Sequence, residues 1–88
     1  MTQTMPGAQE FQSFIGAALS VQGGPDLMLV RVHGPQLGFA LLLRGPASPV
    51  LAEGTYTLTL PSGGSWAPYM MPVHTWERDA QDYQIIVT

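Results

Sequence analysis

The chain has 88 residues, with no cysteine and no lysine, and its three arginines and six acidic residues leave a net charge of −3. Neither disulfides nor a cysteine zinc site can reinforce so small a domain, so packing or partners must hold it together. Three scattered arginines do not form the clustered basic stripe that nucleic-acid binding requires. No window approaches the roughly 20 apolar residues of a membrane span, and no signal peptide is recognisable, so we expect synthesis in the cytoplasm.

Charge is scarce relative to the apolar content. Charged residues make up 10% of the chain and hydrophobic residues 45%, whereas an ordinary soluble domain carries about 25% charged residues. This balance argues against intrinsic disorder. It favours a surface that another polypeptide partly covers, because charge is the main protection against self-association. The alternative is that Thr, Ser and Gln solvate the surface.

The N-terminal part divides into an arm and a helical turn. Residues 1–10 show no periodicity and contain a Pro-Gly turn signal, which predicts an arm preceding a single β-domain over residues 11–88. At the start of this domain we expect one helical turn from Glu10 to Ile15. It would plug an end of the core with Phe11 and Phe14.

Short strands separated by turn signals are predicted for the rest of the chain. They are expected at residues 17–22, 27–33, 38–44, 55–60, 66–73 and 83–88. The run 55–60 alternates between a buried and a wet face, whereas 66–73 contains Pro68 and Pro72, whose missing N–H groups lie on one edge and prevent a regular ladder. The fold class is therefore all-β, a small antiparallel barrel or sandwich of about six strands with one short N-terminal helical turn.

Two loops connect the later strands. Residues 47–54 form a loop whose Val50 and Leu51 we expect to pack back onto the core. Residues 74–82 hold four of the nine charged residues and show no alternation, which is typical of a solvated loop.

Two strands raise the question of what covers their second face. Alternation within 27–33 predicts an apolar face of Met28, Val30 and Val32 and a mixed face of Leu27, Leu29, Arg31 and His33. In 38–44 both faces are apolar until Arg44, which follows five apolar residues. We hypothesise that Ala40 and Leu42 lie under another chain or under the N-terminal arm, with Arg44 at the rim making a charge-assisted contact.

Large aromatic and sulfur-containing side chains cluster after residue 65. Their positions put large side chains on both faces of a proline-bearing strand, and such residues are enriched at interface centres, although one face must be core. The predicted interface residues are Leu42, Arg44, Trp66, Tyr69, Met70, Met71 and Trp76.

Candidates for chemistry do not combine into a site. They are His33 and His74 for a metal, Glu77, Asp79 and Asp82 for acid–base work or calcium, and Ser62 and Ser65 for a nucleophile. The histidines lack further convergent ligands, the carboxylates lack an EF-type spacing and an apolar pocket, and the serines lack a nucleophile elbow. We therefore expect neither an enzyme nor a bound cofactor or metal.

The order of motifs resembles a known family. It consists of Phe11-x-x-Phe14-Ile15-Gly16, L-x-L-x-x-V over 27–32, F-A-L-L-L-R-G-P over 39–46, Leu51-x-Glu53-Gly54-x-Tyr56-x-Leu58 with Pro61, Met70-Met71-Pro72-Val73, and a closing strand with Tyr83. Over residues 11–87 this resembles a family of small bacterial β-domains of unknown function, sometimes encoded near tail-collar or phage-tail-like proteins. Glu53, Leu60 and residues 86–88 depart from its pattern. The resemblance implies a non-catalytic module and transfers no site residue.

These observations favour a structural or adaptor subunit. We expect it to dock through apolar β surface onto other protein subunits or onto itself, in a phage-tail-like or fibre particle into which it is incorporated after synthesis. The alternative is a small ligand- or carbohydrate-binding β-barrel with Trp66, Tyr69 and Trp76 at its mouth. A small-molecule ligand ranks lower because so few strands leave an interior filled by side chains.

Overall fold

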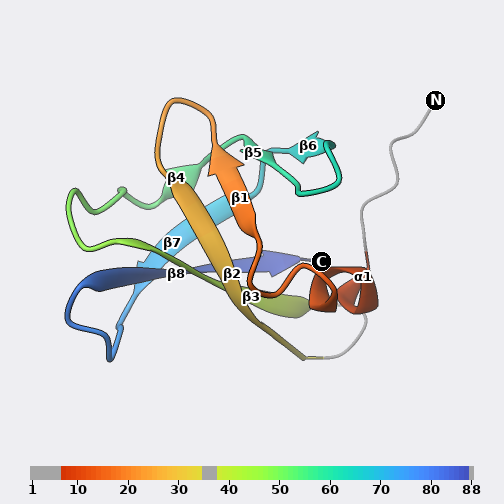
Figure 1. Ribbon diagram of the computed structural model, residues 1–88, viewed down its shortest axis with the longest axis horizontal. Helices are drawn as coiled ribbons and strands as arrows, with labels where there is room; N and C mark the ends of the chain where they lie inside the picture. The colour runs from red at the N-terminus through yellow and green to blue at the C-terminus, as the bar shows by residue number, and fades with distance from the viewer. Residues whose placement is uncertain (1–6, 35–37, 88) are drawn as a thin grey trace.

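One antiparallel sheet, curled into a half-barrel, and one short helix make up the fold in a computed structural model that describes residues 7–34 and 38–87 (Figure 1). The elements are α1 (Ala8–Gln12), β1 (Ala18–Val21), β2 (Asp26–His33), β3 (Phe39–Pro46), β4 (Gly54–Thr55), β5 (Leu58–Thr59), β6 (Ser65–Trp66), β7 (Tyr69–Val73) and β8 (Ala80–Val87). The eight strands follow the order β4-β7-β8-β3-β2-β1-β5-β6. The predicted all-β class with a short N-terminal helical turn is confirmed.

Eight strands arise from about six predicted runs because one hairpin is interrupted. Leu58 lies opposite Trp66 and Thr55 lies opposite Tyr69, so the two ladders share a single register. Between them the Tyr56 N–H donates to the Pro68 carbonyl at 3.1 Å, but Pro68 has no N–H with which to return the bond. The predicted irregularity of this edge is confirmed, and it divides each arm of the hairpin into two short strands.

The same hairpin curls the sheet. Its β4 and β7 halves stand at one end of the strand order, and its β5 and β6 halves stand at the other. The Gln22 N–H donates to the Thr57 carbonyl at 2.9 Å, which adds a bond between β1 and the middle of the hairpin. A flat sheet could not place one hairpin at both of its ends, so the sheet must bend around its core.

The core occupies the concave side of the sheet. Its buried side chains are Phe11, Leu19, Val21, Leu27, Leu29, Phe39, Leu41, Leu43, Leu58, Leu60, Met70, Tyr83 and Ile85. The buried phenol of Tyr83 accepts a hydrogen bond from the Leu51 N–H at 2.8 Å. That bond fastens the 47–53 loop over the core. Leu51 packs inward as expected, but Val50 is 52% exposed, so the prediction for Val50 is wrong.

The helical turn closes one end of the core as predicted, but it begins earlier. The α1 helix starts at Ala8, so residues 8–10 belong to it and not to an arm, whereas residues 1–6 of the predicted arm lie outside the described residues. The fully buried ring of Phe11 lies 5.8 Å from Phe39 and 5.6 Å from Trp66 between ring centroids. A five-residue helix has little intrinsic stability, so these contacts hold it in place. No helix among the described residues is long and apolar enough to cross a membrane.

A β-bulge in β2 changes which side chains face outward. Leu29 lies opposite Leu43, but Arg31, two residues later, lies opposite Leu42, one residue earlier. The extra residue is Val30, and it reverses the alternation that the sequence predicts. Val32 therefore packs against the core, and Arg31 points away from it. The expected apolar face of Met28, Val30 and Val32 is thus wrong beyond Val30.

Candidate docking surface

The strand register builds the convex side of the sheet, which we call the outer face, from four neighbouring strands. Arg31 on β2, Leu42 on β3, Gln84 on β8 and Met71 on β7 lie opposite one another in a single row. The adjacent row consists of Met28, Arg44, Asp82 and Val73. Directly opposed side chains on one face of a sheet lie about 5 Å apart, so each row is a line of contacts.

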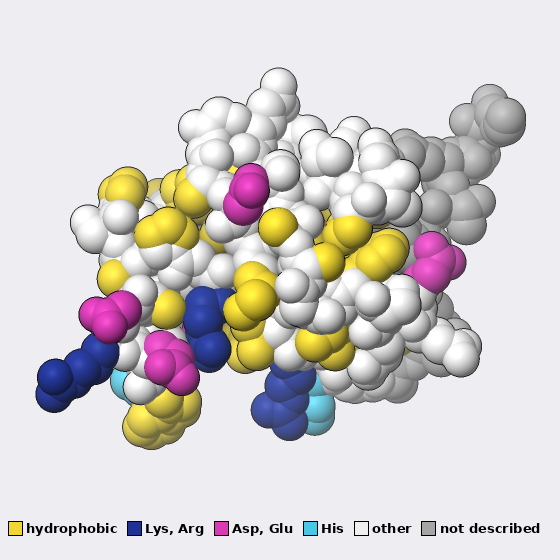
Figure 2. Space-filling model, viewed as in Figure 1, with side chains coloured by type: hydrophobic (Ala, Val, Ile, Leu, Met, Phe, Trp, Pro, Cys, Tyr) yellow, Lys and Arg dark blue, Asp and Glu magenta, His cyan; other side chains and the backbone are white. Residues whose placement is uncertain are grey.

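Apolar side chains dominate the middle of the outer face. We define the outer apolar patch as Met28, Ala40, Leu42, Met71, Val73 and Ile86. Met28 is 43% exposed and Ile86 49% exposed, and the other members are half-buried. Figure 2 shows hydrophobic side chains at the surface beside basic ones, with no continuous coat of charge. The expectation that the N-terminal arm covers Ala40 and Leu42 falls on residues 1–6, outside the described residues.

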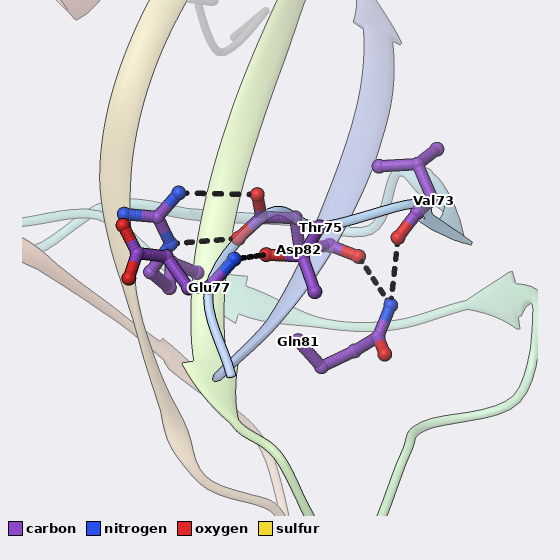
Figure 3. A network of polar contacts seen from close by, with 6 residues as sticks. Val73, Thr75, Glu77, Gln81 and Asp82 are labelled. Atoms are coloured by element: carbon purple, nitrogen blue, oxygen red, sulfur yellow. Dashed lines mark hydrogen bonds and ion pairs between the residues drawn. The ribbon is translucent and has the colours of Figure 1, made fainter. Parts of the chain in front are cut away.

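Arg44 forms its ion pair within its own chain. Its Nε donates to Oδ1 of Asp82 at 2.8 Å and its Nη2 to Oδ2 at 3.2 Å (Figure 3). Arg44 and Asp82 are directly opposed on β3 and β8, which makes this bidentate pairing possible. The hydrogen bond to Asp82 raises the pKa of Arg44 above its ordinary value. The charge-assisted contact expected of Arg44 is thus made to Asp82 of its own chain.

Asp82 is also corrected from loop to strand. The sequence pattern predicts a solvated loop over 74–82, but Asp82 lies in β8 and is only 3% exposed. Gln81 supports this corner, because its Nε2 donates to the Val73 carbonyl at 2.8 Å and to the Asp82 carbonyl at 2.9 Å (Figure 3). The ion pair thus lies between Met28 and Val73, in the end row of the outer apolar patch.

The predicted aromatic and sulfur cluster does not form one surface. Met70 is fully buried in the core, so its assignment to the interface is wrong. Trp66 packs against Phe11 at the plugged end of the core, whereas Met71 lies on the outer face beside Gln84. The strand alternation explains this separation, because adjacent residues of β7 point to opposite sides of the sheet.

Tyr69 and Trp76, two further residues of the predicted interface, are both exposed. Tyr69 is 51% exposed, and its hydroxyl donates to the Glu53 carboxylate, which raises the pKa of the phenol above 10.0. Trp76 is 91% exposed after β7 and meets His74 edge-to-face at 4.6 Å between ring centroids. Together with Trp66, which packs against Phe11, these residues have three different sets of neighbours.

The sequence alone does not assign several residues of the outer face to a surface. Met28 was placed on an apolar face, but nothing in a single sequence distinguished that face from the core. The outward position of Ile86 is predictable, because alternation along the strand puts Ile86 on the same face as the half-buried Gln84 and on the opposite face from Tyr83 and Ile85. The position of Arg31 on the outer face is not predictable, because only the bulge at Val30 brings Arg31 beside Leu42.

A shallow pocket of about 210 Å³ lies in the outer face. Its lining residues are Arg31, His33, Ala40, Leu41, Leu42 and Gln84. Small-molecule sites usually enclose roughly 300–1,000 Å³, so this pocket is sized for a single side chain. Within residues 7–34 and 38–87, no group of three or more His, Asp or Glu side chains is placed to hold a metal ion.

The protein is thus a small all-β domain: a curled antiparallel sheet with a short helix that closes one end of its core and with an apolar outer face. The chain belongs to the family described as a domain of unknown function, DUF6916, whose match covers residues 6–87. Comparison with curated proteins and with solved structures finds no significant match. The expected membership in a family of small domains of unknown function is thus confirmed, and the match carries no link to phage-tail proteins.

Proposed function

We propose that this domain is a non-catalytic structural or adaptor subunit that docks through the outer apolar patch into a larger protein assembly. The observation that carries the proposal is the exposure of Met28 and Ile86 on either side of Ala40 and Leu42. These side chains lie at the middle of the sheet, on β2, β3 and β8, and not in a loop.

The composition of the outer face supports this role. Interface centres are apolar and rich in methionine, and a polar rim surrounds them. Met28 and Met71 provide flexible apolar contacts, and Gln84 and the Arg44–Asp82 pair provide hydrogen-bonding groups between the apolar side chains of their rows. Since Arg44 and Asp82 already satisfy each other, a partner can cover them without leaving a buried charge unpaired.

We extend the proposal to the kind of assembly on the resemblance alone. Domains of similar motif order are sometimes encoded near tail-collar or phage-tail-like proteins. On that basis the assembly is a phage-tail-like or fibre particle, which the chain joins after synthesis in the cytoplasm. The partners are then other protein subunits or further copies of this chain.

A matched pair of substitutions tests the docking role. Ile86 and Val50 are similarly exposed, at 49% and 52%, but only Ile86 belongs to the outer apolar patch. Tagged Ile86→Glu, Val50→Glu and unmodified chains would be recovered from the native source, and their complexes measured by size exclusion with light scattering. We expect the unmodified and Val50→Glu chains to elute in an assembly and Ile86→Glu to elute as the 9.5 kDa chain.

Two outcomes would contradict the proposal. One is an unmodified chain that is monomeric in its native source at every concentration. The other is an assembly that tolerates both substitutions equally. Circular dichroism of each purified variant shows whether the fold is retained.

A further inference from the structure

We infer that the outer apolar patch is covered by a second copy of this chain, packed antiparallel across a two-fold axis so that Arg31 of each copy faces Asp26 of the other. This inference rests on the proposed docking role and specifies its partner. Three observations support it: the charges along β2, the charged loop beside Arg44, and the exposed Met28 midway between Asp26 and Arg31.

The β2 strand carries opposite charges at its two ends. Asp26 is the first residue of β2, and Arg31 and His33 lie near its other end. All three are exposed, and because of the bulge at Val30 Asp26 and Arg31 are four pairing positions apart, about 13 Å along the strand. In the part of the chain that the structure describes, neither Asp26 nor Arg31 forms an ion pair; the salt bridge found there joins Arg44 to Asp82.

A second segment strengthens the polarity of this face. Glu77 and Asp79 lie in the loop between β7 and β8, in an open depression that Arg44, Trp76 and Arg78 also line. Arg44 lies opposite Met28, two residues from Asp26, so these acidic side chains stand at the Asp26 end of the outer face. The other end has Arg31 and His33. The first end thus has four carboxylates, Asp26, Glu77, Asp79 and Asp82, against two guanidinium groups, Arg44 and Arg78, and is acidic on balance, whereas Arg31 gives the other end a positive charge.

Symmetry then selects the orientation of the second copy. A two-fold axis parallel to the strands would bring like ends together, so that Asp26 would face Asp26. An axis perpendicular to the strands reverses one copy against the other and brings each acidic end onto a basic end. Like-charge contacts across an interface are costly and opposite charges fix the register, so only the antiparallel arrangement is favourable.

The same pairing places an apolar side chain on the two-fold axis. Met28 lies opposite Arg44 and Arg31 opposite Leu42, and Asp26, two residues before Met28, is level with Pro46. Met28 is therefore midway between Asp26 and Arg31, and in the antiparallel pair it meets Met28 of the other copy. Met28 is 43% exposed, and its unbranched side chain adapts to such a contact.

Charge reversal and charge exchange on the purified full chain test the inference. The unmodified chain is expected at about twice its 9.5 kDa mass in size exclusion with light scattering. Arg31→Glu and Asp26→Arg each create two like-charge contacts per dimer, and each should weaken dimerisation by tenfold or more. The double variant Arg31→Glu/Asp26→Arg restores opposite charges in the reversed sense and should recover dimerisation to within a few-fold of the unmodified chain.

Two controls separate this effect from general changes in charge or hydrophobicity. Glu10→Arg changes the net charge as Asp26→Arg does, but it lies on α1, and it should leave dimerisation unchanged. Met28→Gln should weaken the dimer, whereas Ile15→Gln, at the same 43% exposure outside the patch, should not. Circular dichroism confirms that each variant is folded.

The outcomes distinguish this inference from the proposed function. A purified chain that is monomeric, but that joins an assembly in its native source through Ile86, overturns the antiparallel pair and leaves the docking role intact. A dimer that survives both single reversals, or that the double variant does not recover, also overturns the pairing of Arg31 with Asp26. If neither the native source nor the purified chain shows association, both proposals fail.

Discussion

Arg44 shows how a chain with few charges uses one of them. It follows five apolar residues in β3, at a position where the outer face ends in polar groups. Asp82 is nearly buried and therefore needs a hydrogen-bonding partner, which the guanidinium provides through two bonds. The charge at Arg44, directly after an apolar run, is thus explained by its cross-strand neighbour Asp82, 38 positions away in the chain.

Removing one side of this pair should destabilise the domain. We expect Asp82→Asn to lower the free energy of unfolding by about 1–3 kcal/mol, because hydrogen bonds to charged groups are lost and the guanidinium is left without its carboxylate. Urea denaturation of Asp82→Asn, Arg44→Met and the double variant gives the coupling energy. Glu77→Gln is the control, because Glu77 lies near Arg44 but shares no hydrogen bond with it in the described structure. Additive single effects would show that the pair contributes nothing.

At the level of the elements, a glycine in β3 lies directly against a core side chain of β2. A Cβ at Gly45 would overlap Cδ2 of Leu27, a side chain with no exposed surface. Leu27 has no open space into which it could move, because protein cores are close-packed. The Gly-Pro that ends β3 therefore has a packing role as well as a turn role.

Two glycine substitutions test this contact. Gly45→Ala should lower the free energy of unfolding by about 1–3 kcal/mol, since overpacking forces side chains off their rotamers or shifts the backbone. Gly54→Ala in β4 is the matched control, because a Cβ there meets no atom within 4 Å. Its effect should stay within about 0.5 kcal/mol. Equal midpoints of thermal unfolding for the two variants would contradict the argument.

The elements also show what alternation can and cannot predict. Strands were predictable at 17–22, 38–44 and 55–60. Runs that alternate between apolar and polar residues, or that are apolar throughout, are typical of a pleated backbone. The interruption of the hairpin was predictable because proline lacks a donor. The bulge at Val30 was not, since both faces of β2 carry apolar residues and either register buries some of them.

The site was less predictable than the fold for a related reason. Of the residues expected at an interface, Leu42, Arg44 and Met71 lie together on the outer face, whereas Met70 faces inward. Deciding between the two faces of a proline-bearing strand requires knowing which strands flank it. That pairing joins segments far apart in the chain, so composition and local spacing do not encode it.

For the whole molecule, scarce charge and an exposed apolar patch act together. The sequence pI is about 4.9, so the net charge of −3 at pH 7 vanishes in mildly acidic solution. Loss of net charge removes the repulsion that keeps apolar surfaces apart.

We therefore expect a solubility minimum near pH 4.9, measured by turbidity across a pH series. Ile86→Lys should shallow this minimum by placing a charge in the patch and by moving the point of zero charge upward. The matched control is Val50→Lys, which should move the minimum equally but leave its depth nearly unchanged. A minimum of equal depth in both variants would mean that the patch does not drive association.

The interrupted hairpin limits how this domain can join others. Because the hairpin stands at both ends of the strand order, the two terminal strands of the described sheet are β4 and β6, each two residues long. A peptide or a second subunit has almost no backbone template at these two strands on which to extend the sheet by β-augmentation. Stacking of such domains at the ends of the strand order must therefore proceed through side-chain surfaces, and its strength there will depend on surface substitutions more than on the hydrogen-bonding capacity of the main chain.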